Sequence, residues 1–552
     1  MSLQTRTGTD FYTDVRFERK GQKTDGDNGS VTNNTFLVKE SNSDILLSAT
    51  GKLSEKFTGS FSLGANHLKR HQEVTGNYGT NLNVDGIYTI SNTQNVTPRH
   101  YASGKEMNSG YFTGQLGYNN YLFIDVTGRN DWSSTLGVNN YSFFYPSVGA
   151  SFVFTDALKM GQGFLSYGKL RASIAEAGND ASPFLTKAGY DVHSSTTFNG
   201  QPFANIRSDI PLTNLKNELT KFYEFGTELR FLNNRLGLDF TYYNASTINQ
   251  ILPVEISAGT GYSSRLINAG EIRNSGIEIF LTGTPVKSKN FSWDISLNLS
   301  NNKSKVVSLA PGITSITLRD PGFGASIEAR VGGPFGSIIG YKAKRNKNGD
   351  VLVTSDGGWQ RADEREVLGK IQPDFLAGLT NSLTYKDLSL SFLIDTRKGG
   401  QVLSFSKLNQ MAKGTGKFTE NRTNLIIDGV IETTPGHFEK NTKVIAAQAY
   451  YAAGGPWSDV GETQVIDADY VALREAIIGY NLTSLLKKGN FFKTLRLSVV
   501  GSNLFYFYRD PQFKQMGISP ESAFNTTAAA QGYEAVSMPT TRSIGINLSL
   551  SF

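Results

Sequence analysis

The stretch Arg542–Phe552 reads RSIGINLSLSF, and it decides how the rest of the sequence is interpreted. Its large apolar side chains occupy every second position: Ile544, Ile546, Leu548, Leu550 and Phe552. Because successive residues of a β-strand point to opposite faces, the segment has one apolar face and one polar face. An apolar stripe of about nine residues is roughly what a tilted strand needs to cross a bilayer. A strand of a soluble sandwich has the same pattern, so this segment alone leaves both interpretations open.

The composition excludes several classes of protein. The 552 residues include no cysteine and five histidines, none of them in an HExxH arrangement, so disulfides, thiolate metal sites and zinc hydrolase chemistry have no support. The formal net charge of +6 is modest for this length, which argues against nucleic-acid binding. There is no apolar run of about eighteen residues, so helical membrane spans are not expected. We expect no enzymatic activity, no cofactor and no metal.

Segments with alternating apolar residues recur along the whole chain. The clearest pair is Phe222–Phe231 and Leu236–Tyr243, with a polar turn between them. Phe375–Tyr385 is likewise followed by a turn at Lys386 and then by Leu388, Leu390, Phe392 and Ile394. We count about sixteen such segments, which predicts an all-β, antiparallel architecture.

The connections between these segments alternate between short polar turns and long excursions. The long excursions are expected at 18–43, 70–107, 178–220, 251–270, 308–373, 407–466 and 508–540, with a shorter one near 132–142. Within the second of them, Val84–Ile90 is interpreted as a strand inside a loop. Outer-membrane barrels have short turns at one end and long loops at the other. The pattern therefore predicts an antiparallel transmembrane β-barrel with about sixteen strands in this chain.

Several stretches resemble the SusC/RagA-type TonB-dependent transporters of the Bacteroidetes outer membrane. The stretches that carry the resemblance are Gly128–Ser134 (GRNDWSS), Tyr141–Val148 (YSFFYPSV), Asn268–Ile279 (NAGEIRNSGIEI), Val331–Pro334 (VGGP), Tyr470–Tyr480 (YVALREAIIGY) and Leu495–Phe505 (LRLSVVGSNLF). They are spread over about residues 110–552 and occur in the order that is typical of the family.

The resemblance implies a barrel of about 22 strands with a plug domain in its lumen. It also implies energy supplied by TonB, and a SusD-like surface lipoprotein that helps to capture oligosaccharides or peptides. We expect residues 1–552 to be the C-terminal part of such an outer-membrane β-barrel domain, with the plug and TonB box not present in this chain. The TonB complex would then act only through the missing N-terminal part. The expected location is the bacterial outer membrane, with its lipid as a further partner and no nucleic acid.

Two other functions fit the alternating strands. One is a complete passive porin of about sixteen strands, a size known among porins. The other is a soluble all-β module that binds glycans or acts as an adhesin. Detergent-free solubility and ion conductance in a lipid bilayer would distinguish them.

Aromatic residues in the expected loops are the candidate binding residues. We single out Tyr190, Tyr262, Trp359 and Trp457 for substrate binding, because flat aromatic side chains stack on sugars or hold peptide side chains. The alternative is that these residues pack the loops against each other. Phe552 is the candidate barrel assembly signal, because the chain ends on this aromatic residue of the apolar stripe.

Overall fold

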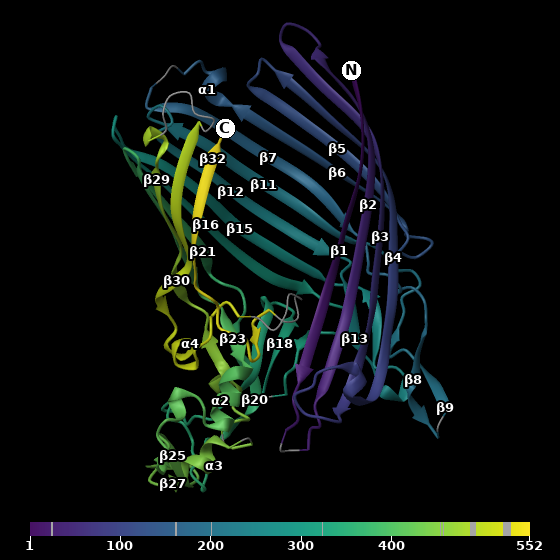
Figure 1. Cartoon of the computed structure of the whole chain (residues 1–552), viewed down its shortest axis with the longest axis vertical. Coiled ribbons are helices and arrows are strands. Elements are labelled where there is room, and N and C mark those ends of the chain that lie inside the picture. Colours follow the sequence, from purple (N-terminus) through teal and green to yellow (C-terminus); the bar gives the residue numbers. More distant parts are fainter. Residues whose placement is uncertain are drawn as a thin grey trace. The chain divides into compact units, whose positions relative to one another are not determined.

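A sixteen-stranded antiparallel sheet is the largest element of the computed structural model (Figure 1). The structure describes residues 1–552 except 24–25, 161–162, 200, 323, 453, 456, 486–492 and 523–530. In order of pairing, the strands are β1 (Ser2–Lys20), β2 (Ser30–Lys52), β3 (Phe57–Leu82), β4 (Thr93–Tyr118), β5 (Leu122–Ser133), β6 (Ser142–Val153), β7 (Leu165–Asn179), β11 (Glu218–Phe231), β12 (Leu236–Ile248), β15 (Glu271–Lys287), β16 (Phe291–Ser308), β21 (Phe375–Tyr385), β22 (Leu388–Lys398), β29 (Tyr470–Asn481), β30 (Thr494–Arg509) and β32 (Ser543–Ser551).

Short turns join the strands where the sequence predicts them. β21 and β22 are joined at Lys386, whose φ is 51°, and the β11–β12 turn contains Asn233 and Asn234 with φ of 55° and 66°. Asparagine adopts this left-handed conformation more readily than most residues. The predicted all-β antiparallel fold and the count of about sixteen strands are confirmed.

The chain divides into two compact units. The first comprises Met1–Phe152, Arg171–Tyr223 and Ser246–Glu271. Its strands β2, β3 and β4 are 23, 26 and 26 residues long, and they lie side by side in register. It also contains the small strands β8 (Tyr190–Phe198), β9 (Gln201–Ile206), β10 (Asp209–Ile210), β13 (Ile251–Glu255) and β14 (Ser264–Asn268).

Two predictions for this first unit are wrong. The long excursions expected at 18–43 and 70–107 are reduced to the short connections 21–29 and 83–92, because polar residues extend the strands. Val84–Ile90 forms no strand; it lies in the second connection, which ends in a 3-10 turn. The hydrogen bonds between neighbouring strands are made by backbone groups, so a strand can continue where its apolar alternation stops. Polar cross-strand pairs such as Thr9 with Ser41, with 3.0 Å between their hydroxyl oxygens, accompany these extensions.

The second compact unit comprises Val153–Leu170, Glu224–Ala245 and Ile272–Phe552. Between its sheet strands lie β17 (Ser315–Arg319), β18 (Ala325–Arg330), β19 (Phe335–Ala343), β20 (Arg361–Lys370), β23 (Gln401–Ser404), β24 (Leu425–Ile426), β25 (Val430–Thr434), β26 (His437–Lys440), β27 (Val444–Ile445), β28 (Val465–Asp467) and β31 (Tyr533–Glu534). Its helices are α1 (Phe154–Ala157), α2 (Phe405–Lys413), α3 (Ala447–Tyr451) and α4 (Pro511–Met516). The Val331–Pro334 motif lies between β18 and β19.

The connections of the second unit contain buried hydrophobic cores of their own. One core joins the β18–β19 sheet to β31 through Ile327, Ile338 and Tyr533. Another surrounds Trp457, and a third packs Ile466 against Phe513 of α4. These long connections are therefore folded substructures.

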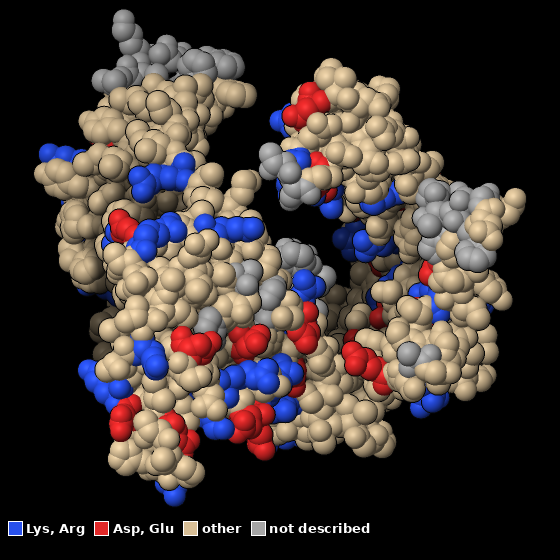
Figure 2. Space-filling model, turned by 90° about the horizontal axis from the view of Figure 1, so that it is seen from below, with Lys and Arg blue, Asp and Glu red and all other residues tan. Residues whose placement is uncertain are grey.

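Charged side chains of both signs are interspersed on the face of the molecule that Figure 2 shows. Among the described residues, no helix is long and apolar enough to cross a membrane.

Candidate functional site

A β-bulge in β29 places an arginine at the centre of a polar cluster. Leu473 and Glu475 pair with the consecutive residues Ile394 and Leu393 of β22. Arg474, which lies between them, is therefore the extra residue of the bulge. The pairing of β29 with β30 also shifts at this level, where Asn503 has a φ of 52°. Bulges bend a strand and redirect the side chains beside them. The local geometry therefore depends on two irregular strands.

The bulge decides which face Arg474 occupies. On one side of it Ile478 pairs with Leu390, and on the other Leu473 pairs with Ile394. Directly opposed residues point to the same face, so Ile478 and Leu473 both belong to the apolar stripe although they are five positions apart. In an unbroken strand Arg474 would share the face of Ile478. The inserted residue allows its guanidinium to lie on the polar face.

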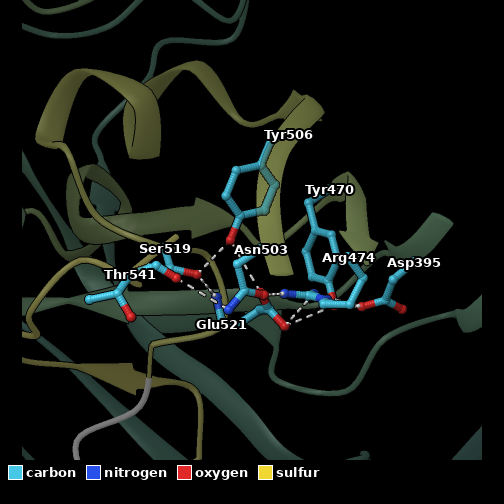
Figure 3. Close-up of polar contacts among 8 residues, drawn as sticks. All are labelled: Asp395, Tyr470, Arg474, Asn503, Tyr506, Ser519, Glu521 and Thr541. Atoms are coloured by element: carbon cyan, nitrogen blue, oxygen red, sulfur yellow. Dashed lines mark hydrogen bonds and ion pairs between the residues drawn. The ribbon is translucent and has the colours of Figure 1, made fainter. Parts of the chain in front are cut away.

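The Arg474 guanidinium contacts groups from three segments (Figure 3). Its Nε and Nη2 donate to Oδ2 of Asp395 on β22, at 3.1 and 2.6 Å. Nη2 also donates to Oε1 of Glu521 at 2.8 Å, and Nη1 donates to Oδ1 of Asn503 at 3.0 Å. Hydrogen bonds between ionised groups are stronger than neutral ones, and these ionised side chains are only 23–31% exposed. Arg474 thus ties the sheet to the connection that follows β30.

Glu521 lies in that connection, residues 510–542, and its carboxylate accepts hydrogen bonds from two tyrosines. Its Oε1 accepts from the Tyr470 hydroxyl at 3.2 Å, and its Oε2 accepts from the Tyr506 hydroxyl at 3.1 Å. The Tyr506 hydroxyl also lies 2.9 Å from Oγ of Ser519. The rings of Tyr470 and Tyr506 meet edge to face with centroids 5.9 Å apart. Two strands therefore hold the same carboxylate.

The cluster performs a fastening role. Asn503 extends it by donating from Nδ2 to the backbone oxygen of Thr541 at 3.4 Å, so the cluster contacts the connection at Thr541 as well as at Glu521. The described residues contain no group of three or more His, Asp or Glu side chains that could hold a metal ion. The chemistry of the cluster is charge pairing and hydrogen bonding between the sheet and a loop.

A partly buried lysine, Lys407, joins the connection after β22 to the connection after β30. Lys407 of α2 donates from Nζ to Oε1 of Gln512 at 2.6 Å and to the backbone oxygen of Thr463. Burial lowers the pKa of the Lys407 ammonium to about 8, and nearby Asp510 opposes this shift. The connections after β22 and β30 therefore share a polar contact made by a lysine whose pKa is lowered by burial.

The four aromatic residues selected from the sequence are not gathered into one site. Trp457 is 0% exposed and Trp359 packs against the same hydrophobic core. In the first unit, Tyr190 is 72% exposed at the start of β8 and Tyr262 is half-buried. The two tryptophans lie in a packed loop core, as the alternative interpretation expects. A role of any of the four residues in binding stays a prediction. Phe552, 72% exposed, follows β32 directly.

The sequence analysis did not identify Arg474, Asp395, Asn503 or Glu521. One signal was present: in YVALREAIIGY the apolar positions change phase between Leu473 and Ala476. Arg474 and Glu475 interrupt the apolar alternation, which continues after them shifted by one position. A β-bulge produces this shift because it inserts one extra residue into the strand. No comparable signal marks Glu521, because its partners lie on distant strands.

The sixteen-stranded antiparallel sheet is the architecture that outer-membrane barrels require. The family model described as TonB dependent receptor-like, beta-barrel matches residues 2–504. The chain belongs to this family, whose members are outer-membrane receptors and transporters.

Curated relatives and solved structures agree with this assignment. "TonB-dependent receptor P26" of Formosa agariphila is 26% identical over 96% of this chain and 54% of its own length. "TonB-dependent receptor SusC" of Bacteroides thetaiotaomicron is 24% identical over 80% of this chain and 43% of its own. The chain thus spans about half the length of the curated relatives it matches. A chain from "Structure of the RagAB peptide transporter" matches with a TM-score of 0.76 and 18% identity, over 100% of this chain and 60% of that one, which shows a shared fold.

Proposed function

We propose that this chain forms the barrel of a SusC-like importer in the bacterial outer membrane. The main support is the sixteen-stranded sheet of a TonB-dependent receptor, in which apolar residues alternate with polar ones along strands such as β12, β22 and β32. Such a sheet presents an apolar face to lipid and a polar face to the path of a solute. The role is transport, without catalysis. In this proposal residues 1–552 are the C-terminal part of the barrel domain.

The proposed solute is an oligosaccharide or a peptide, captured together with a SusD-like surface lipoprotein. The similarity to a protein named SusC and to a RagAB peptide transporter supports this class of solute and partner. TonB would act through a segment of the full transporter other than the barrel strands described here. Tyr190 is proposed as a contact residue, and its exposed ring supports this because it is free of cover and can stack on a sugar or an apolar side chain.

The test is energised uptake by cells that express the full-length protein containing this chain. Labelled oligosaccharides and labelled peptides are supplied in parallel, with and without dissipation of the proton-motive force. We expect uptake of one solute class that stops on dissipation, and co-purification of a surface lipoprotein. Uptake that is indifferent to the proton-motive force, with open-channel conductance in planar bilayers, would support a passive porin. A protein that stays soluble without detergent would support an all-β adhesin or glycan-binding module.

Phe552 is proposed to act in assembly of the barrel. The C-terminal aromatic residue continues the apolar stripe of β32, so its replacement removes an apolar anchor from that strand. For Phe552→Ser we expect a several-fold lower yield of heat-modifiable, folded barrel in the outer membrane. Ser551→Ala is the matched control on the polar face. Equal yields for the two variants would contradict the role of Phe552.

A further inference from the structure

A cavity of ≈ 370 Å³ is formed by the extended strands β3 and β4 and the chain that follows β7. Its lining comprises Arg70, Gln72, Ser103–Lys105 and Asn179–Pro183, so the whole cavity belongs to the first compact unit. At this level β3 pairs with β2 on one side and with β4 on the other. The cavity therefore rests on paired strands, away from β1 and β32, which end the sheet. Its volume is within the range of small-molecule sites, about 300–1,000 Å³.

The side chains of β3 and β4 that line the cavity lie on the polar face of the sheet. Because side chains alternate between the faces of a strand, Lys105 shares a face with Tyr111, whose hydroxyl donates to Oδ2 of Asp44 at 2.8 Å. Leu116, of the apolar stripe, lies on the other face. Arg70 is the cross-strand partner of Lys105, and directly opposed side chains point to the same face. In the proposed function the polar face borders the path of the solute, so the inference drawn from this cavity rests on that function.

The lining of the cavity has one positive charge in excess. Asp180, the only acidic residue among the described lining residues, is already paired: its Oδ1 accepts from Nζ of Lys105 at 2.5 Å, and its Oδ2 accepts from Oγ of Ser133 at 2.6 Å. The Asp180 side chain is only 6% exposed. Arg70 is exposed, and none of the described residues forms an ion pair or a hydrogen bond with its guanidinium. A ligand that enters the cavity therefore meets one uncompensated cation.

Amide and hydroxyl groups surround this cation. Gln72 of β3 and Ser103 of β4 line the cavity beside Arg70. A guanidinium presents its N–H groups in a planar fork that matches the two oxygens of a carboxylate. Amides and hydroxyls both donate and accept hydrogen bonds, so they suit the neutral polar groups next to such a carboxylate. A phosphate monoester, with a charge of about −1.5 to −2 at pH 7, exceeds what one free cation balances.

We propose that this cavity binds a carboxylate group of an acidic solute on its path through the barrel. Arg70 holds the carboxylate, and Gln72 and Ser103 form hydrogen bonds with the polar groups beside it. The ion pair between Lys105 and Asp180 keeps the chain after β7 against β4 and so forms the wall of the cavity. Uronic-acid oligosaccharides and acidic peptides both carry this group. The inference therefore narrows the proposed solute to an acidic member of one of these classes.

The test is isothermal titration calorimetry of the full-length protein in detergent, with trigalacturonate and with acetylated, amidated tetraglutamate. The trimethyl ester of trigalacturonate and the corresponding tetraglutamine peptide are the matched neutral ligands. We expect at least one acidic ligand to bind, and its neutral counterpart to bind about thirty-fold more weakly. Arg70→Gln should weaken binding of the acidic ligand by about the same factor, because the hydrogen bonds between ionised groups are lost. Arg70→Lys keeps the charge without the planar fork and should lie between the parent and Arg70→Gln.

Lys69→Gln is the matched charge control. It removes a cation from the position next to Arg70, on the opposite face of β3, and should bind the acidic ligand as the parent does. Heat-modifiable mobility equal to that of the parent shows that each variant is folded. The acidic ligand that binds identifies the class of the solute.

Three results would overturn the proposal. The first is that neither acidic ligand binds to the parent protein, and the second is that an acidic ligand and its neutral counterpart bind equally. The third is equal affinity of folded Arg70→Gln and Lys69→Gln for the acidic ligand. Energised uptake that persists while the acidic ligands fail to bind would refute only this inference. Binding that depends on Arg70, in a protein without energised uptake, would refute only the transport function.

Discussion

Apolar residues have opposite surroundings in two regions of the second unit, the strand β32 and the core of the connection after β22. Ile544 and Ile546 of β32 are largely exposed, whereas Trp457 is completely buried. The strand has regular alternation, and yet its apolar side chains are largely exposed in the described part of the chain. The connection has no such regularity, and it packs like the interior of a soluble domain.

In the proposed outer-membrane location, the two regions lie in different solvents. A lipid-facing strand needs no protein over its apolar face, because acyl chains cover it. A connection in water must bury its apolar side chains itself, at roughly 25 cal/mol gained per Å² of apolar surface. The same residue types therefore stabilise the strand only in a membrane and the loop core only in contact with each other.

The largest effect is expected in the loop core. Trp457→Ala should destabilise it by about 3–5 kcal/mol, because a large buried side chain is lost and a cavity remains. Urea unfolding followed by the fluorescence of Trp359, in the same core, measures this change. Ile546→Ala is the contrasting variant, and it should leave the loop transition within about 0.5 kcal/mol of the parent. Equal effects would remove the distinction between the two regions.

The lipid-facing character of β32 can be tested by adding a charge. Ile546→Lys should cost about 2–4 kcal/mol in a bilayer, since a lysine on the lipid face loses its hydration. The neighbouring change, Asn547→Lys, points to the polar face and should cost little. Urea titration of the protein in lipid vesicles, with folded barrel scored by heat-modifiable mobility, compares the two. A larger cost for Asn547→Lys would reverse the assignment of the faces.

Lys407 predicts a pH dependence confined to the loop region. Its pKa is lowered to about 8 in the folded protein from its ordinary value of 10.5, so the unfolded state binds more protons between these two values. The free energy of unfolding should therefore rise as the pH increases from about 8 to 10.5. Below pH 8 the cost of burying the charged Lys407 ammonium should be fully present. Because Lys407 is partly exposed, we expect the free energy of unfolding to rise by only about 2 kcal/mol over this pH interval.

The measurement is the loop transition in urea at pH 8 and pH 10.5, for the parent and for Lys407→Met. The variant has no ammonium to titrate, so its stability should change less over this interval. The same pH dependence in both proteins would show that other groups cause it.

The smallest effect is expected at the polar cluster, which joins the sheet to the connection after β30. Arg474→Met removes the donor shared by Asp395 and Glu521, which should loosen residues 510–522 by about 1–2 kcal/mol because the pairs are half-buried. Limited proteolysis of that segment should become about ten-fold faster. Arg496→Met, which removes one hydrogen bond to Ser389 on β22, is the matched control. Equal cleavage of both variants would exclude the fastening role.

Much of the sheet could be predicted because each strand carries its own pattern. β21 begins and ends where the sequence predicts, and β32 matches its predicted stripe. The extensions of β3 and β4 could not be predicted, since their polar residues pair through the backbone and leave no apolar signal. The candidate site was missed for a related reason: Glu521 joins β29 across many residues of sequence, and no local pattern encodes that contact.

The sequence by itself determined the period of two and most of the turns and long connections, and its motifs, such as Gly128–Ser134, carried the resemblance to the barrel family. Those properties are local, because successive side chains of a strand point to opposite faces and the sequence of one strand suffices to show it. Only the tertiary structure decided that Trp457 is buried, that the bulge turns Arg474 away from the apolar face, and that Arg70 shares a cavity with the chain after β7. These outcomes depend on pairing between distant segments, whose free energies are set by packing and charge in three dimensions.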